Sequence, residues 1–110
     1  MKNNKIIVSI CSRKYNINLL KLLENLEKNQ RYKKLNLEIL ILFNSLKKLN
    51  KDQFKKIQII LKGIHFNVNY EKKIGVSFAR NSVLKFLSNK KFRYGCFLDD
   101  DCFIKKNFLI

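Results

Sequence analysis

Four short apolar runs recur along the chain, at residues 5–10, 37–43, 64–70 and 94–98. The first two, KIIVSI and LEILILF, show little alternation of apolar and polar positions, which is typical of strands buried on both faces of a parallel sheet. The third run alternates apolar and polar residues from Ile64 to Tyr70, as expected of a strand with one wetter face. The pattern therefore predicts four strands.

The segments between these runs have apolar residues at helical spacing, beginning with Leu19, Leu22, Leu23 and Leu26. Asn16 or Asn18 is available to cap this first helix. Asp52 is predicted to cap a second helix that ends near Gly63, and Ser77 a third that precedes the last strand. The expected order is β-α-β-α-β-α-β.

Strands that alternate with helices predict an α/β fold, a Rossmann-like parallel sheet with flanking helices and right-handed crossovers. The 110 residues suit a single domain that spans residues 1–110. Sheets of this kind place ligands at the carboxyl ends of their strands. The segments just past the strand ends are residues 11–15, 44–45 and 99–101, and we expect them to line one edge.

Three adjacent carboxylates, Asp99, Asp100 and Asp101, follow the last apolar run of a chain that has a net charge of +16 and only eight acidic residues. Two unit charges about 4 Å apart repel by about 1 kcal/mol in water and by about 4 kcal/mol near a protein surface. A divalent cation would relieve this repulsion. The alternative is a solvated turn, balanced by Lys105 and Lys106, or a cap on a following helix.

The strong positive charge favours partners that carry phosphate, such as a nucleotide, nucleic acid or anionic lipid. The abundance of Lys, Asn and Ile, with no Pro or Trp, also fits an AT-rich coding sequence, so the charge discriminates weakly between these partners. The basic residues are dispersed, and no known nucleic-acid-binding motif occurs. We therefore do not expect nucleic acid to be the partner, although a basic nucleic-acid-binding module stays an alternative.

Other common site types lack their sequence signals. Cys11, Cys96 and Cys102 have no CxxC spacing and His65 is the only histidine, so neither a disulfide framework nor a zinc site is indicated. No GxGxxG or GxxxxGK[ST] motif occurs, although another Rossmann-like nucleotide binder stays open. The first apolar stretch is too short for a signal peptide or a spanning helix. We expect a reduced, cytoplasmic chain, whose charge would allow peripheral contact with the inner face of the membrane.

Five segments, taken in order and spacing, carry a resemblance to a known family: IIVSICSRKYN, LLKLLENLEKNQ, LEILILFNS, IGVSFARNSVL and FLDDD. They resemble the nucleotide-binding half of family 2 glycosyltransferases, which have the GT-A fold. The GxSxARN pattern and the three aspartates are the more specific segments. The resemblance implies that the chain binds a nucleotide-diphosphate sugar, with a UDP-sugar as the expected donor.

The resemblance also implies a metal site. In the family, a DXD motif after the fourth strand holds Mg²⁺ or Mn²⁺ against the donor diphosphate, and Asp99 and Asp101 match its outer positions, with Asp99 also at the donor. Hard oxygen ligands suit both ions, and Mg²⁺ prefers a couple of carboxylates plus substrate phosphates. The metal would act as a Lewis acid that stabilises the departing nucleoside diphosphate.

Further donor contacts follow from the other matched segments. Arg80 and Asn81 match the family's ARN segment near the donor pocket, where a guanidinium can bind phosphate in a bidentate manner. The alternative for Arg80 is the solvated face of its helix. The loop with Ser12, Arg13 and Tyr15 corresponds to the stretch that touches the nucleoside, and Tyr15 either stacks on a uracil or packs in the core.

Two features depart from the family. The proline common in the first loop is missing, and Asn44 stands where an aspartate is usual, as a candidate contact to the base or ribose. In the family, the acceptor site and catalytic base come from a second half, so we assign no catalytic residue and expect these 110 residues alone not to transfer sugar. A truncated product, an incomplete sequence, and a split enzyme whose second polypeptide supplies the acceptor half all stay open.

Overall fold

Strands and helices alternate along the chain in the computed structural model, which describes residues 5–33 and 36–100. The alternation predicted from the sequence is confirmed. The elements are β1 (Ile6–Ser12), α1 (Ile17–Lys33), β2 (Leu37–Phe43), α2 (Lys51–Ile60), β3 (His65–Tyr70), α3 (Val76–Leu87) and β4 (Tyr94–Asp99).

The four strands form one parallel sheet in the order β3-β2-β1-β4. The chain moves outward from β1 through β2 to β3 and then crosses back to place β4 on the other side of β1. The direction of strand addition therefore reverses between β1 and β4. In open parallel sheets, such a reversal opens a crevice outside the carboxyl ends of the strands, and ligands bind there.

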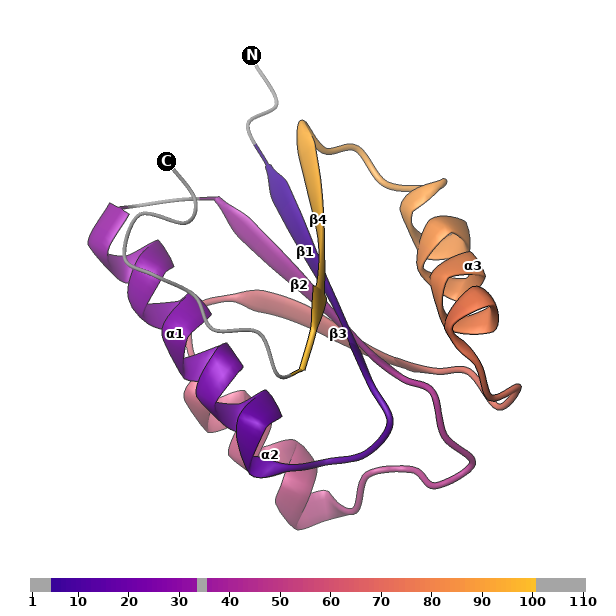
Figure 1. Ribbon diagram of the computed structural model, residues 1–110. Helices are drawn as coiled ribbons and strands as arrows, with labels where there is room; N and C mark the ends of the chain where they lie inside the picture. The colour runs from indigo at the N-terminus through magenta and orange to yellow at the C-terminus, as the bar shows by residue number, and fades with distance from the viewer. Residues whose placement is uncertain (1–4, 34–35, 101–110) are drawn as a thin grey trace.

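The helices cover the two faces of the sheet unequally (Figure 1). On one face, α1 and α2 enclose the main core, in which the buried apolar side chains of these helices meet Val8, Ile10, Ile39 and Ile41. On the other face, α3 packs Ala79 and Val83 against Leu40 and Leu42 of β2. The neighbouring part of β4 is left open on the α3 side, where Phe97 is 44% exposed.

Local capping differs in part from the sequence prediction. Asn16 caps α1 as expected, since its Oδ1 accepts a hydrogen bond from the backbone N–H of Leu19 at 3.0 Å. The prediction that Asp52 caps α2 is wrong, because the N-cap is Asn50, which exchanges reciprocal side-chain-to-backbone hydrogen bonds with Gln53. Asp52 lies inside the first turn, where only its charge favours the helix end.

The prediction that Ser77 caps α3 is also wrong. The N-cap is Gly75, which has a φ of 142° that residues with a side chain rarely adopt. The backbone N–H of Gly75 donates to Oδ1 of Asn44 at 2.8 Å, so a residue at the end of β2 fixes where α3 begins. Because Gly75 has no side chain, the N-cap residue offers no side-chain acceptor to the N–H groups of the first turn of α3.

Each helix packs an apolar face toward the sheet. None of the helices in residues 5–33 and 36–100 has the length and apolar character needed to cross a bilayer. The cytoplasmic location and the peripheral membrane contact stay predictions.

Candidate functional site

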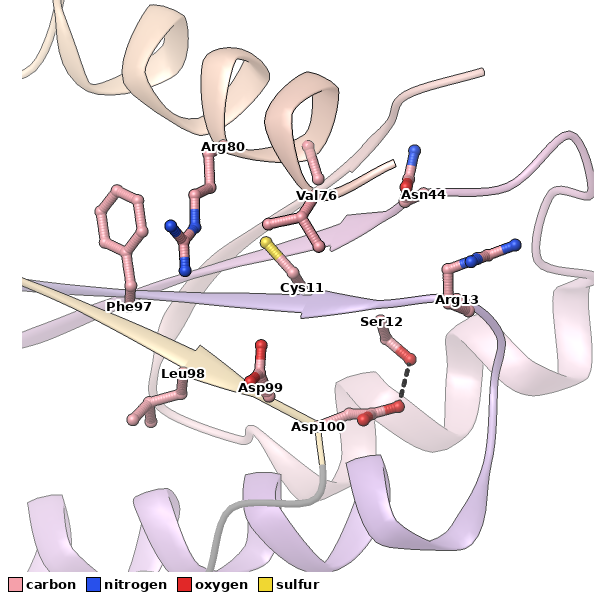
Figure 2. Close-up of a pocket in the computed structure, with 11 residues that line it drawn as sticks. Cys11, Ser12, Arg13, Asn44, Val76, Arg80, Phe97, Leu98, Asp99 and Asp100 are labelled. Carbon is pink, nitrogen blue, oxygen red and sulfur yellow. Dashed lines mark hydrogen bonds between the residues drawn. The ribbon is translucent and has the colours of Figure 1, made fainter. Parts of the chain in front are cut away.

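A cavity of about 390 Å³ opens at the carboxyl edge of the sheet, beside the reversal between β1 and β4 (Figure 2). The end of β1, the end of β2, the first turns of α3 and the end of β4 all contribute to it. Its lining residues are Cys11, Ser12, Arg13, Asn44, Val76, Ala79, Arg80, Phe97, Leu98, Asp99 and Asp100. The strand ends that the sequence analysis grouped at one edge do meet here.

Arg80 and Asp99 bring opposite charges to this cavity. Figure 2 shows Arg80 reaching from α3 toward the strands, while Asp99 points from the end of β4 into the same space. Within the described residues, neither side chain makes a hydrogen bond or an ion pair. The fold thus presents a cation and an anion whose charged atoms are left for another partner.

The Cys11 thiol lines the same cavity, and both charges affect its pKa. Burial raises the pKa of Cys11 most, the Asp99 carboxylate raises it further, and the Arg80 guanidinium lowers it in part. Cys11 and Asp99 are direct neighbours across β1 and β4. Because the net effect is a raised pKa, the thiol is neutral at pH 7 and forms part of the cavity wall without adding charge.

Asp100 is held differently from Asp99. Its Oδ2 lies 2.7 Å from the Ser12 hydroxyl and 2.8 Å from Nδ2 of Asn16, the residue that also caps α1. Successive residues of a strand point to opposite faces, which explains why Asp100 turns toward the start of α1 and Asp99 toward α3. Ser12, expected at the donor, therefore anchors the end of β4 at the rim of the cavity.

Asn44 is buried on the cavity wall, and its amide is occupied by the β3–α3 connection. Its Nδ2 donates to the backbone carbonyls of Glu71 at 3.0 Å and Lys73 at 2.7 Å, and its Oδ1 accepts from Gly75. Both amide donors are thus used within the protein. Asn44 fixes the start of the helix that carries Arg80, a role that the sequence analysis did not foresee.

The remaining predicted site residues lie elsewhere. Arg13 is exposed at the rim of the cavity (Figure 2). Tyr15 packs against the main core and lines a neighbouring hollow of about 190 Å³ with Phe43 and Lys48. Asn81 is exposed on α3 and lines neither hollow. Asp101, the second predicted metal ligand, lies outside the described residues.

Several wall residues were missed by the sequence analysis, chiefly Val76, Ala79, Phe97 and Leu98. Strand parity offered a signal for Phe97, since it lies on the same face of β4 as Asp99. In residues 5–33 and 36–100, no group of three or more His, Cys, Asp or Glu side chains is placed to hold a metal ion. The DXD metal site stays a prediction.

A second charged cluster lies at the opposite, amino-terminal end of the sheet. The Glu38 carboxylate, whose side chain is 2% exposed, lies 3.2 Å from Nζ of both Lys5 and Lys90, and Asn67 donates to it at 3.3 Å. Burial acts to raise the pKa of Glu38, but the hydrogen bonds and charges of the two lysines outweigh burial and hold the pKa below its ordinary value. This cluster lies on the far side from the cavity and is satisfied internally.

The fold and the place of the cavity define a small Rossmann-like α/β domain with a charged pocket at the carboxyl edge of its sheet. Comparison with known proteins finds no matching family model, no similar curated protein and no matching solved structure. The resemblance to family 2 glycosyltransferases consequently depends on the residues of this chain alone.

Proposed function

We propose that the chain binds a nucleotide-diphosphate sugar, with UDP as the expected nucleotide, together with a divalent metal, in the manner of the donor half of a family 2 glycosyltransferase. The observation that carries the proposal is the meeting of Arg80 and Asp99, each without a partner among the described residues, in one cavity at the reversal of the sheet. A diphosphate and its metal would need both charges at once.

The α3 side of the cavity suits phosphate. A guanidinium such as that of Arg80 keeps its charge at all relevant pH values and offers paired donors to phosphate oxygens. Val76, the first residue of α3, lines the cavity, and the first turn of this 12-residue helix has no side-chain cap. Its free N–H groups and helix dipole would add to the attraction of an anion.

The β4 side suits a divalent metal. The Asp99 carboxylate makes no contact that would compete with a metal within the described part of the chain, whereas Asp100 is held by Ser12 and Asn16 on the α1 side. Mg²⁺ prefers one or two carboxylates completed by donor phosphates, and Mn²⁺ accepts the same oxygen ligands. Asp101 is the further ligand expected from the resemblance. When bound, the metal would supply Lewis-acid stabilisation of the diphosphate leaving group.

The remaining candidate residues indicate where the other parts of the donor would lie. A cavity of about 390 Å³ falls within the roughly 300–1,000 Å³ of small-molecule sites. Ser12 and Arg13 line this cavity, and the residues that follow them, Lys14 and Tyr15, line the second hollow, so we place the nucleoside toward Tyr15 and the diphosphate at Arg80. Asn44 contributes by holding α3 in place, and Asn81 has no assigned contact.

The direct test is thermal unfolding with UDP and UDP-sugars, with and without Mn²⁺, after circular dichroism has established that the chain is folded. Binding at a hundredfold excess over Kd stabilises by about 2.7 kcal/mol, which is easily measured. Asp99→Asn should remove the Mn²⁺-dependent part of the response, and Arg80→Gln most of the nucleotide response. Arg31→Gln removes the same charge from α1, far from the cavity, and should leave both responses intact.

The proposal fails if nucleotide and metal together leave Tm unchanged in the folded protein, or if Asp99→Asn responds like the wild type. Single-stranded DNA serves as a competitor for the same sample. If DNA affinity falls steeply with salt and is the same in Asp99→Asn and Arg80→Gln as in the wild type, the nucleic-acid alternative is favoured instead.

A further inference from the structure

Two neighbouring loops at the carboxyl edge of the sheet expose aliphatic side chains. In the β2–α2 loop Leu46 is 75% exposed, and in the β3–α3 loop Ile74 is 45% exposed. Figure 1 shows both loops at the same edge of the sheet, at the lower right. Neither Leu46 nor Ile74 lines the cavity beside β4, so the cavity does not account for their exposure. Apolar side chains exposed together on one surface mark sites of contact with a protein or a membrane.

The fold holds the two loops next to each other. Asn44, at the start of the β2–α2 loop, donates from Nδ2 to the Lys73 carbonyl of the β3–α3 loop at 2.7 Å. Within the β2–α2 loop, the Lys47 N–H donates to the Ser45 hydroxyl at 3.1 Å, which closes a short turn around Leu46. The exposed aliphatic side chains therefore project from loops whose backbone is fixed by hydrogen bonds.

Lysines adjoin both aliphatic side chains. Two follow Leu46 and two precede Ile74, and all four are exposed: Lys47, Lys48, Lys72 and Lys73. None of the four forms an ion pair with a carboxylate in residues 5–33 and 36–100. The Lys73 ammonium lies over the ring of Phe78, 5.6 Å from its centroid, and this ring is also exposed. We call these four lysines, together with Leu46, Ile74 and Phe78, the tip surface.

Positive charge dominates the tip surface. In residues 44–54 and 71–78, the carboxylates are Asp52 and Glu71. Glu71 accepts hydrogen bonds from the Ser82 hydroxyl and from the backbone N–H of Lys73, and Asp52 lies in the first turn of α2. Neither carboxylate pairs with a lysine side chain of the tip surface, so the charge of these lysines is left for an anionic partner.

Exposed aliphatic tips with flanking lysines suit the surface of an anionic bilayer. Binding to such a surface increases with the apolar area that is buried and with the number of basic side chains near the headgroups. Aliphatic side chains on separate loops can enter the headgroup region without a partner of matching shape, while the lysine ammonium groups stay at the phosphates. A nucleic acid would pair with the lysines but would leave Leu46 and Ile74 exposed to water.

We propose that the tip surface docks on a membrane that contains anionic phospholipid, with Leu46, Ile74 and Phe78 among the headgroups and the four lysines at the phosphates. The inference goes beyond nucleotide-sugar binding and needs no ligand in the cavity, because no residue of the tip surface lines the cavity. It assigns a face of the molecule to the peripheral membrane contact that the net charge led us to expect.

Co-sedimentation with lipid vesicles, in the absence of nucleotide and metal, tests this inference separately from the proposed function. The wild-type chain should bind vesicles of equal parts phosphatidylcholine and phosphatidylglycerol much more tightly than vesicles of phosphatidylcholine alone. Each lysine near an anionic surface contributes about fivefold in affinity, so the difference should exceed about tenfold. A chain that binds both kinds of vesicle equally, or neither, overturns the proposal.

Leu46→Ser tests the apolar contribution. The change should weaken binding to the anionic vesicles about fivefold, because a serine has no aliphatic surface to bury among the headgroups. Ile59→Ser is the matched control, since Ile59 is an aliphatic residue that is 65% exposed in the last turn of α2, at the other edge of the sheet. Circular dichroism should match the wild type for both variants, because both positions are exposed. Equal binding by the two variants contradicts docking through the tips.

Lys47→Gln with Lys72→Gln tests the charged contribution and should weaken binding to the anionic vesicles about 20-fold. Lys62→Gln with Lys91→Gln removes the same charge from exposed positions at the amino edge of the sheet and should change the affinity less than about twofold. An equal loss in both double variants would show a general attraction of the net charge and would overturn the assignment of this face.

Single-stranded DNA distinguishes lipid from nucleic acid as the partner. For docking on lipid, Leu46→Ser should weaken binding to the anionic vesicles and leave DNA affinity unchanged. If Lys47→Gln with Lys72→Gln weakens the binding of vesicles and DNA alike, and Leu46→Ser changes neither, the tip surface binds phosphate without entering the bilayer. That result would make the lipid proposal wrong.

Discussion

Two carboxylates at opposite ends of the same sheet differ in what the fold provides for them. Glu38, at the amino end, is buried against two lysines and an asparagine. Asp99, at the carboxyl end, is exposed in a cavity and contacts no described residue through a hydrogen bond or ion pair. Two lysines therefore pair with Glu38, whereas no described residue pairs with Asp99.

This difference separates a structural charge from one that is available to a ligand. A buried charge is tolerated only when it is paired and hydrogen-bonded, so Glu38 and its partners form a unit that belongs to the folded state. Asp99 needs no such partner in water, and its neighbour in the cavity, Arg80, is equally uncommitted. Substitution of Glu38 should therefore lower mainly the stability, and substitution of Asp99 mainly the response to ligand.

The largest effect on stability is expected for Glu38→Ala. The change removes the carboxylate that the half-buried side chains of Lys5 and Lys90 share. We expect it to cost about 2–3 kcal/mol. For a domain of about 100 residues, each kcal/mol lowers Tm by roughly 4–8 °C. Thermal unfolding measures the loss, with Glu24→Ala, an exposed glutamate on α1, as the matched control. Equal Tm values for the two variants would remove the distinction between the ends of the sheet.

A somewhat smaller loss, about 2 kcal/mol, is expected for Asn44→Ala at the cavity end. The substitution leaves the Gly75 N–H and the carbonyls of Glu71 and Lys73 without the Asn44 amide. Asn69→Ala removes an exposed asparagine from β3 and serves as the control in urea unfolding. If Asn44→Ala keeps full stability yet loses the nucleotide response, Asn44 is a ligand contact and not a structural clamp.

The sequence was sufficient for the element order and for the meeting of strand ends, because apolar periodicity and parallel topology determine both. It was insufficient wherever a side chain depends on distant partners. Asn44 reaches residues 27–31 positions further along the chain, and Glu38 lies 33 positions from Lys5. In the sequence Glu38 is only one polar residue within an apolar strand, and nothing local marks it as the centre of an ion cluster.

The two wrong caps have the same origin. Asp52 and Ser77 are suitable capping residues by type, but Asn50 gains a reciprocal partner in Gln53, and Asn44 determines the start of α3 from another strand. Arg80 illustrates the converse case. From the sequence, Arg80 could lie either on the solvated face of its helix or in the pocket. The packing of α3 over β2 brings it to the cavity rim.

An intermediate effect is expected from pH. The folded pKa of Glu38 lies below its ordinary value of 4.5, so the unfolded chain binds this proton more readily. The stability from the charged Glu38 is therefore fully present above its unfolded pKa and is lost as pH falls through the folded pKa. The Tm gap between wild type and Glu38→Gln should be constant from pH 6 to 7 and shrink below about pH 4.5. A gap that widens on acidification would show that Lys5 and Lys90 do not stabilise the carboxylate.

The smallest effect on stability is expected for Asp99→Asn, within about 0.5 kcal/mol of the wild type, as is usual for exposed positions. The amide keeps the shape of the side chain and removes a charge that no described residue balances by contact. The same variant should show the largest loss of Mn²⁺-dependent stabilisation by UDP, measured by calorimetric titration beside thermal unfolding. A strong loss of Tm without any ligand would instead make Asp99 a structural charge like Glu38, and the contrast between the two ends of the sheet would disappear.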